Sequence, residues 1–215
     1  MTTRARVESA GGVTLPLDSE QPEPAGPLAA DVRRLETIRR AVSQIIGAIG
    51  EDPTRDGLRE TPARMAAMYA EVFGGVGVDP VTELAVTFEE GHQEMVVLRD
   101  IGFHSMCEHH FLPFYGVAHV GYIPRGRVVG VGKLARVVEI LSRRPQLQER
   151  LTSQVADTIV RGLHPEGVAV VIRATHLCMT MRGPNTPGGE VITSAMRGIF
   201  RRSAATRAEF MSLIR

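Results

Sequence analysis

The first clear pattern along the chain is a set of apolar residues spaced three and four positions apart. It covers residues 31–49, where Asp31 is placed to cap the start and Gly50 to end the segment. That spacing puts the apolar side chains on one face of a helix, so we predict an amphipathic helix there. A second helix is predicted over residues 61–73, because Thr61-Pro62 resembles an N-cap followed by proline at the first helical position.

After residue 80 the preferences turn to strand-forming residues, interrupted by further segments of helical spacing. Strands are predicted over residues 84–88, 95–98, 116–123, 168–178 and 191–193. Helices are predicted over residues 134–141, 147–163 and 207–214. The break at Glu89-Glu90-Gly91 is expected to join the first two strands as a hairpin. This order predicts an α+β fold, with an antiparallel sheet and helices packed on one face.

The same patterns divide the chain into three regions. Residues 1–30 are rich in Pro, Gly, Ala and Ser and show no sustained period, which predicts a mobile tail. Residues 31–80 are predicted to form an N-terminal helical extension. Residues 81–215 are predicted to form the α+β domain that carries the chemistry. The length of 215 residues is enough for one sizeable core.

Charge and composition narrow the possible partners. The 25 Lys and Arg nearly balance the 24 Asp and Glu, so no overall field draws the protein to nucleic acid or to a membrane. Trp is missing and aromatic residues are few, which leaves little for stacking on single-stranded nucleic acid. The start of the chain lacks the apolar core of a secretory signal, and no run approaches the ~18 apolar residues of a membrane span. We therefore expect a soluble, cytoplasmic protein.

The candidate chemistry is concentrated in two short runs that contain both cysteines of the chain, Cys107-Glu108-His109-His110 and His176-Leu177-Cys178. Thiolate and imidazole together suit a cation such as zinc. Cys107, His110 and Cys178 would supply three protein ligands and leave a fourth position for water. That is the arrangement of a catalytic zinc, which lowers the pKa of bound water toward ~7. Hydrolysis is then the natural reaction class.

The remaining histidines can be sorted in the same way. Because side chains two apart on a strand share a face, His176 would lie beside Cys178 and close to whatever the metal activates. His109 and His176 are thus candidates for proton transfer near neutral pH. The residues alone leave open which of His109 and His110 binds metal. They also leave open a structural alternative, in which buried thiols pack as small apolar groups and the histidines bond to the backbone. His164 is expected at a helix end.

From about residue 51 to its C-terminus, the chain resembles the GTP cyclohydrolase I family. The resemblance rests on blocks in the family's order: Glu51-Asp52-Pro53, Thr61-Pro62-Ala63-Arg64, Cys107-Glu108-His109-His110, Gly130-Val131-Gly132-Lys133-Leu134-Ala135-Arg136, Gln148-Glu149-Arg150-Leu151-Thr152, His176-Leu177-Cys178-Met179 and Met181-Arg182-Gly183. It implies zinc-dependent hydrolytic opening of the guanine imidazole ring of GTP. The products would be formate and 7,8-dihydroneopterin triphosphate, in the first step of folate and pterin biosynthesis. It also implies a tunnelling-type fold in a toroidal homodecamer with active sites at subunit boundaries.

The resemblance implies a role for each matching residue. The zinc ligands would be Cys107, His110 and Cys178, and the proton-transfer residues His109 and His176. Guanine presents N1–H and an exocyclic amine as adjacent donors, which one carboxylate can accept together, so Glu149 would select GTP over ATP. The other substrate contacts would be Gln148 beside it and a basic cluster on the triphosphate, Lys133, Arg136, Arg182 and Arg64.

One position departs from the family's pattern. Immediately before Lys133 the family usually has a serine that contacts the phosphate region of the substrate, and here the residue is Gly132. Loss of one hydroxyl contact would cost ~1 kcal/mol. This leaves open a paralogue in specialised metabolism, with an altered purine substrate or a partial reaction. A noncatalytic zinc- or nucleotide-binding protein is the other alternative, and it would need neither an open ligand position nor His176.

Overall fold

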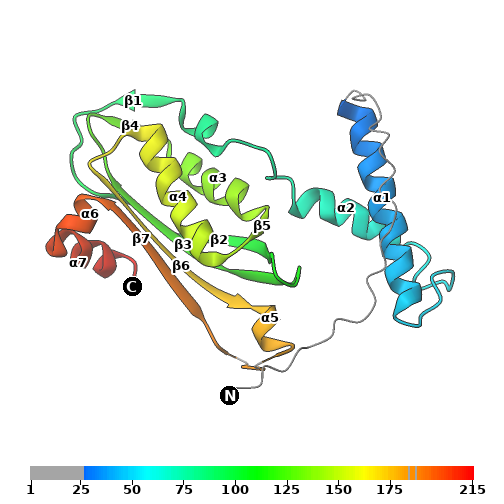
Figure 1. Ribbon diagram of the computed structural model, residues 1–215. Coiled ribbons are helices and arrows are strands. Elements are labelled where there is room, and N and C mark those ends of the chain that lie inside the picture. The colour runs from blue at the N-terminus through cyan, green and yellow to red at the C-terminus, as the bar shows by residue number, and fades with distance from the viewer. Residues whose placement is uncertain (1–26, 184, 187) are drawn as a thin grey trace, which may run out of the picture.

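The centre of the structure is a five-stranded sheet with the strand order β5-β2-β3-β6-β7 (Figure 1). The computed structural model describes residues 27–183, 185–186 and 188–215, so most of the predicted tail over residues 1–30 lies outside the described residues. The long strands are antiparallel neighbours: β2 (Val96–Cys107), β3 (Pro113–Ile123), β6 (Gly167–His176) and β7 (Val191–Gly198). The short β5 (Pro145–Gln146) pairs with the end of β2 in parallel.

Helices α3 (Val131–Ser142) and α4 (Gln148–Leu163) cover one face of this sheet, and the main core lies between them (Figure 1). The apolar spacing read from the sequence predicted both helices. The opposite face is covered at one end by α6 (Ile199–Arg202) and α7 (Ala204–Leu213). The prediction of helices on one face alone is therefore wrong for the C-terminal helices.

The side chains of strand β6 are apolar on both faces of the sheet, so both faces need to be covered by helices. Val170 and Ile172 belong to the core under α3 and α4, whereas Ala169 and Val171 pack with Phe200 and Phe210 on the other side. A strand that is buried on both faces has a continuous apolar run in place of alternation. The continuous run is therefore consistent with burial on both faces, but it could not identify α6 and α7 as the helices that cover the second one.

The N-terminal region forms a helical pair beside the sheet. Helices α1 (Pro27–Ala48) and α2 (Thr61–Val72) pack together, next to the end of the sheet where β5 lies (Figure 1). Helix α1 begins at Pro27, so the prediction that Asp31 caps it is wrong. The C-terminal end of α2 reaches the sheet domain through Phe73, whose ring centroid lies 5.5 Å from that of Phe111.

The region after α2 also differs from the prediction. Residues Pro80–Leu84 form the short helix η1, because Asp79 accepts a hydrogen bond from Val81 N–H at 3.1 Å and Pro80 begins the turn. Strand β1 (Thr87–Glu89) then pairs with β4 (Arg127–Val129) in a separate two-stranded sheet. The predicted hairpin between residues 84–88 and 95–98 is therefore wrong.

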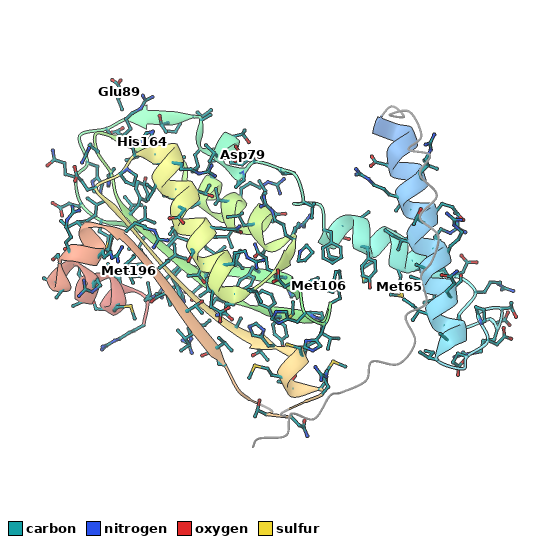
Figure 2. All side chains as sticks on the ribbon, viewed as in Figure 1. Met65, Asp79, Glu89, Met106, His164 and Met196 are labelled. Carbon is teal, nitrogen blue, oxygen red and sulfur yellow. The ribbon has the colours of Figure 1, made fainter. Side chains whose placement is uncertain are left out.

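Figure 2 labels His164 at the end of α4, and Met65 and Met106 at a cavity. His164 ends α4 with a positive φ of 47° and its N–H bonds to the carbonyl of Val160, as expected for a residue at a helix end. Met65 on α2 and Met106 on β2 line a mainly apolar cavity of about 720 Å³ between these elements.

Among the described helices, none combines the length and apolar character needed to cross a membrane.

Candidate metal centre and active site

Cys107, His110 and Cys178 meet at one end of the sheet. Cys107 is the last residue of β2, His110 lies in the turn that follows, and Cys178 lies in α5 (Leu177–Thr180) directly after β6. Each offers one ligand atom, and these atoms all lie within 4.8 Å of one another. The strand pairing produces this meeting, because β3 joins β2 on one side and β6 on the other.

The turn after β2 is held closely by its own backbone. Phe111 N–H donates to the carbonyl of Cys107 at 2.8 Å, and Cys107 N–H donates to the carbonyl of Leu112 at 2.9 Å. Phe111 adopts a positive φ of 51°, which is uncommon for a residue with a side chain. This closure presents His109 and His110 at the surface beside the buried Cys107.

The donor set fits zinc. Two cysteine sulfurs and an imidazole are ligands that zinc prefers, and they leave one position of a tetrahedral site to a small molecule. Burial raises the pKa of the Cys178 thiol, and the neighbouring Cys107 raises it further. A divalent cation between the sulfurs would reverse this effect, because it stabilises the thiolate form.

His176 lies at the inner side of the cluster. Its ring stacks on Phe114 with centroids 4.5 Å apart and planes within 3° of parallel. Burial lowers the pKa of His176, while the Glu149 carboxylate acts in the opposite direction. The predicted strand over residues 168–178 ends at His176, so the strand periodicity does not relate His176 to Cys178. The first turn of α5 carries Cys178 toward Cys107 instead.

Glu108 and Arg150 join the turn after β2 to the start of α4. Arg150 Nη2 donates to Glu108 Oε1 at 3.0 Å, and Nη1 contacts the second carboxylate oxygen. The Arg150 guanidinium lowers the pKa of Glu108. The pair fixes the turn that carries His109 and His110. Sequence reasoning missed this contact, because its two members are distant in the chain and neither residue type signals the other.

The first turn of α4 brings two predicted site residues to the cluster. Gln148 is buried and its amide contacts Nε2 of His176, whereas Glu149 is exposed next to it. Arg182 Nη1 lies 2.5 Å from Nε2 of His110, so a positive charge stands at the mouth of the cluster. The structure thus gathers one set of predicted residues around a single site: Cys107, His109, His110, Gln148, Glu149, His176, Cys178 and Arg182.

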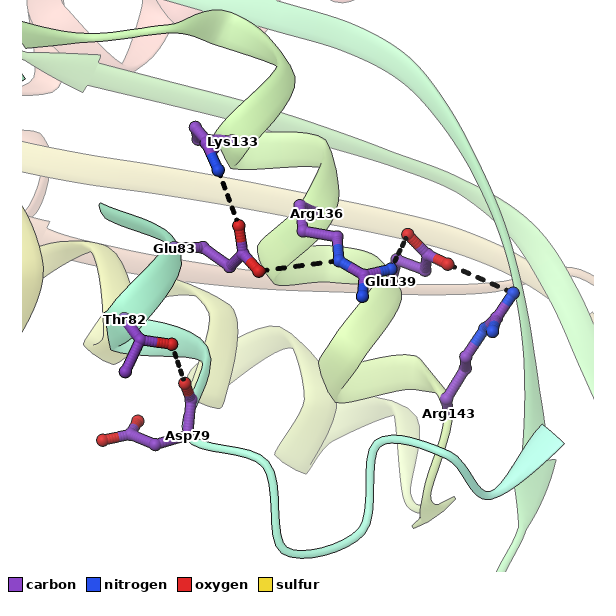
Figure 3. Close-up of polar contacts among 7 residues, drawn as sticks. All are labelled: Asp79, Thr82, Glu83, Lys133, Arg136, Glu139 and Arg143. Carbon is purple, nitrogen blue, oxygen red and sulfur yellow. Dashed lines mark hydrogen bonds and ion pairs between the residues drawn. The ribbon is translucent and has the colours of Figure 1, made fainter. Parts of the chain in front are cut away.

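Lys133 and Arg136 lie elsewhere. They belong to the first turns of α3, where Lys133 Nζ is 2.8 Å from Glu83 Oε2 and Arg136 Nε is 3.7 Å from Glu83 Oε1 (Figure 3). Arg136 also pairs with Glu139 at 2.6 Å. At a rise of ~1.5 Å per residue, Lys133 is about 13 to 14 Å along the helix from its C-terminal end at Ser142. That far end leads into β5, which pairs with Cys107.

Arg64 and Gly132 complete the predicted set. Arg64 is exposed in the first turn of α2, at the opposite end of that helix from Phe73. Gly132 is exposed in the first turn of α3, and a Cβ there would meet no described atom within 4 Å. A serine would fit, so lack of space does not explain the glycine. Within this chain, Lys133, Arg136 and Arg64 are not brought to the cysteine and histidine cluster.

Fold and site together define a class of protein: an α+β protein whose sheet ends in a thiol and imidazole cluster, with a partly buried histidine and a carboxylate beside it. The family model described as GTP cyclohydrolase I matches residues 38–215. The chain belongs to the GTP cyclohydrolase I family.

Curated relatives agree with this assignment. GTP cyclohydrolase 1 of Dehalococcoides mccartyi strain 195 is 60% identical over 181 residues, which cover 83% of this chain and 96% of the relative. GTP cyclohydrolase 1 of Carboxydothermus hydrogenoformans is 62% identical over 180 residues, with 83% and 94% covered. GTP cyclohydrolase 1 of Bacillus subtilis strain 168 is 57% identical over 181 residues, with 84% and 95% covered.

Proposed function

We propose that this protein is a zinc-dependent GTP cyclohydrolase, which converts GTP and water to formate and 7,8-dihydroneopterin triphosphate. This reaction would be the first step of folate and pterin biosynthesis. The observation that carries the proposal is the meeting of Cys107, His110 and Cys178 beside His176, in a chain of this family. Relatives about 60% identical over most of the chain bear the name of this enzyme.

Cys107, His110 and Cys178 would hold one zinc ion per subunit. Zinc bound there supplies a Lewis acid that lowers the pKa of water toward ~7 and so provides a nucleophile at neutral pH. The buried Cys107 and the partly buried Cys178 hold the inner side of the site. The exposed His110 leaves the outer side open to a substrate.

His176 and His109 are proposed to move the protons. Ring opening adds one water at C8 of guanine and breaks one bond from C8 to a ring nitrogen, and a second water then breaks the other bond and releases C8 as formate. Closure of the new ring returns one water, so the net reaction uses one. Each departing nitrogen needs a proton. Burial lowers the pKa of His176, which keeps its ring neutral and able to accept a proton near pH 7. His109 stands exposed beside His110, with ring centroids 6.2 Å apart.

Glu149 and Arg182 are proposed to orient the substrate. Glu149 is exposed next to His176, where its carboxylate can accept both N1–H and the exocyclic amine of guanine. Adenine lacks this pair of donors, so ATP is excluded. Arg182 stands beside His110 and can pair with a phosphate oxygen.

We propose further that the protein is a homo-oligomer, a toroidal decamer whose active sites form between subunits. Lys133 lies at the end of α3 far from Cys107, Arg136 lies near the middle of that helix, and Arg64 lies on α2. A triphosphate held near Arg182 would meet Lys133 and Arg136 from a neighbouring copy. Phosphate oxygens would then replace the Glu83 carboxylate as partners of Lys133 and Arg136.

The test is to incubate purified protein with GTP and follow formate release and the pterin chromophore, with and without a chelator. We expect both products from GTP, their loss with the chelator, their return with added zinc, and neither product from ATP. If zinc-loaded protein yields neither product, the proposal fails and a noncatalytic binding protein becomes the better reading. Formate without the pterin would indicate the partial reaction that Gly132 leaves open.

A further inference from the structure

The side chain of Gln148 is buried and engaged at both ends. Only 1% of the residue is exposed. Its Nε2 lies 2.9 Å from the carbonyl oxygen of Val191, and 3.1 Å from both the carbonyl oxygen of Ile172 and Thr193 Oγ1. Its Oε1 lies 2.7 Å from Nε2 of His176. The amide therefore contacts the candidate catalytic histidine, and both of its polar atoms have partners inside the chain.

The two carbonyl groups decide which way the amide faces. A carbonyl oxygen accepts hydrogen bonds and donates none, so the group that faces Ile172 and Val191 must be the NH₂. The reversed amide would set its oxygen against two other oxygens in a buried space, where an unpaired polar group is costly. The oxygen of Gln148 therefore faces His176, and it can only accept.

This acceptor decides which ring nitrogen of His176 carries the proton. An accepting oxygen 2.7 Å from Nε2 requires an N–H at Nε2, so the lone pair of the neutral ring lies at Nδ1. The stack on Phe114 fixes the plane of the ring at the same time. We propose that Gln148 is a positioning residue, which holds His176 in the Nε2–H tautomer so that protons enter and leave the ring at Nδ1 alone.

The inference deepens the proposed function and rests on it for the use made of His176. The Nε2–H stays bonded to Gln148 whether or not Nδ1 carries a proton, so the ring keeps its place while a proton passes to or from the substrate. A histidine in the other tautomer would present an N–H where a lone pair is needed. Loss of proton transfer costs roughly 10²–10⁴-fold in rate.

The first measurement is solid-state ¹⁵N NMR of histidine-labelled, zinc-loaded protein, with the His176 signals assigned by their loss in His176→Gln. We expect a protonated Nε2 and a bare Nδ1 for neutral His176. A protonated Nδ1 with a bare Nε2 in the wild-type protein would overturn the proposal. The NMR measurement does not require the enzyme to turn over GTP. Failure of this inference can therefore be distinguished from failure of the proposed function.

The second measurement compares Gln148→Met with Thr193→Val. The methionine removes the acceptor, so we expect both His176 tautomers and a fall in kcat of roughly 10²-fold with KM changed less than about 3-fold. Thr193→Val keeps both carbonyl groups that orient the amide, so it should keep the Nε2–H tautomer and kcat. A single Nε2–H tautomer in Gln148→Met contradicts the proposal. So does a rise in KM alone, which would mean that Gln148 contacts the substrate directly.

Should Gln148→Met fail to fold, as judged by zinc content and thermal unfolding, the wild-type spectrum and Thr193→Val still decide. Loss of the Nε2–H tautomer in Thr193→Val would show that the carbonyl groups of Ile172 and Val191 do not orient the amide, and the inference would fall.

Discussion

Cys178 and His176 stand two positions apart, yet they are proposed to do different things. Cys178 sits in the first turn of α5, with its sulfur in the cluster of possible metal ligands. His176 ends β6 and is held by Phe114 and Gln148. The separation of metal binding from proton transfer can therefore be tested with single substitutions.

We expect Cys178→Ala to lose both bound zinc and activity, because two ligands cannot replace three. His176→Ala should keep its zinc and lose at least about 10²-fold in kcat, because a proton-transfer group is gone. Zinc content by elemental analysis and formate release by assay measure the two effects. Full zinc in Cys178→Ala, or near-normal kcat in His176→Ala, would contradict the assigned role.

His119 links stability to pH. It is 2% exposed, and its Nδ1 accepts a hydrogen bond from Asp100 N–H at 3.1 Å. Burial lowers the pKa of His119, although the Asp100 carboxylate acts against this and Arg173 adds to it. Below the ordinary histidine pKa of ~6.5, the unfolded chain therefore binds more protons than the folded one. Stability is complete above that pH and is lost as pH falls toward the folded pKa.

The thermal midpoint should accordingly fall as pH is lowered from 7 to 5, and His119→Gln should fall less over that range. His104→Gln is the matched control, because His104 is exposed on the neighbouring strand β2. The measurement is thermal unfolding at constant zinc. Equal slopes for wild type and His119→Gln would show that His119 does not carry the effect.

Residue types alone predicted that the two cysteines and a histidine of the turn after β2 would meet, because thiols are scarce in this chain and chemically distinctive. They left open whether that histidine is His109 or His110, and the family resemblance pointed to His110. They could not predict Gln148 as the partner of His176 or Glu108 as the partner of Arg150. Amides, carboxylates and guanidinium groups occur throughout the chain, and what singles these out is burial and distance in three dimensions. The sequence signal at Gln148 was its place beside Glu149, which suggested substrate contact.

At the scale of elements, the close pairing of β3 and β6 keeps Phe114 against His176. Gly116 lies two residues along β3, opposite Ala174. A Cβ at Gly116 would come within 1.8 Å of the carbonyl oxygen of Arg173, which is backbone and cannot move aside. Glycine at this position is thus a condition for the site.

Gly116→Ala should therefore lower stability by about 2–4 kcal/mol and the thermal midpoint on the order of 10 °C. Zinc content should fall with it. Gly102→Ala on the adjacent strand is the control, because a Cβ there meets no described atom within 4 Å. Thermal unfolding of both variants decides the question, and equal stability would contradict the assigned role of the glycine.

Helix spacing predicted α2, α3, α4 and α7, because an apolar face leaves a regular trace in the sequence. Strands were harder to predict where a local helix-starting signal competed with the strand preference of the residues that follow it. A strand was predicted over residues 84–88, but the Asp79-Pro80 cap starts a helical turn that ends at Leu84, and the shorter strand β1 pairs with β4. Such pairings depend on residues far along the chain, and no local pattern records them.

At the scale of the whole molecule, the predicted site residues fall into two groups within one chain. The C-terminal end of α3 leads toward the cluster around Cys107 and His176, whereas Lys133 lies at the other end of α3 and Arg136 near its middle. A site shared between copies would reunite them. Cys178→Ala and Lys133→Ala would then damage different halves of the same site.

Cys178→Ala and Lys133→Ala should each be nearly inactive alone, but oligomers assembled from both variants should recover part of the activity. Random assembly of equal amounts through a repeated interface leaves about a quarter of the sites intact. A mixture of Cys178→Ala with Cys107→Ala is the control and should stay inactive, because both variants damage the same half. Formate release by co-expressed, co-purified subunits is the measurement. No recovery in the first mixture would argue for sites built within single chains.

The position of the cysteines also bears on the kinetics of folding. Cys107 closes β2 and Cys178 follows β6, so the donors meet only after β3 has paired with both strands. A newly made chain would therefore acquire its full ligand set late, when most of the sheet is in place. Metal captured at that stage stabilises the native state more than the transition state, so its main effect would be to slow unfolding. Removing it should shorten the lifetime of the folded protein while leaving the rate of folding nearly unchanged.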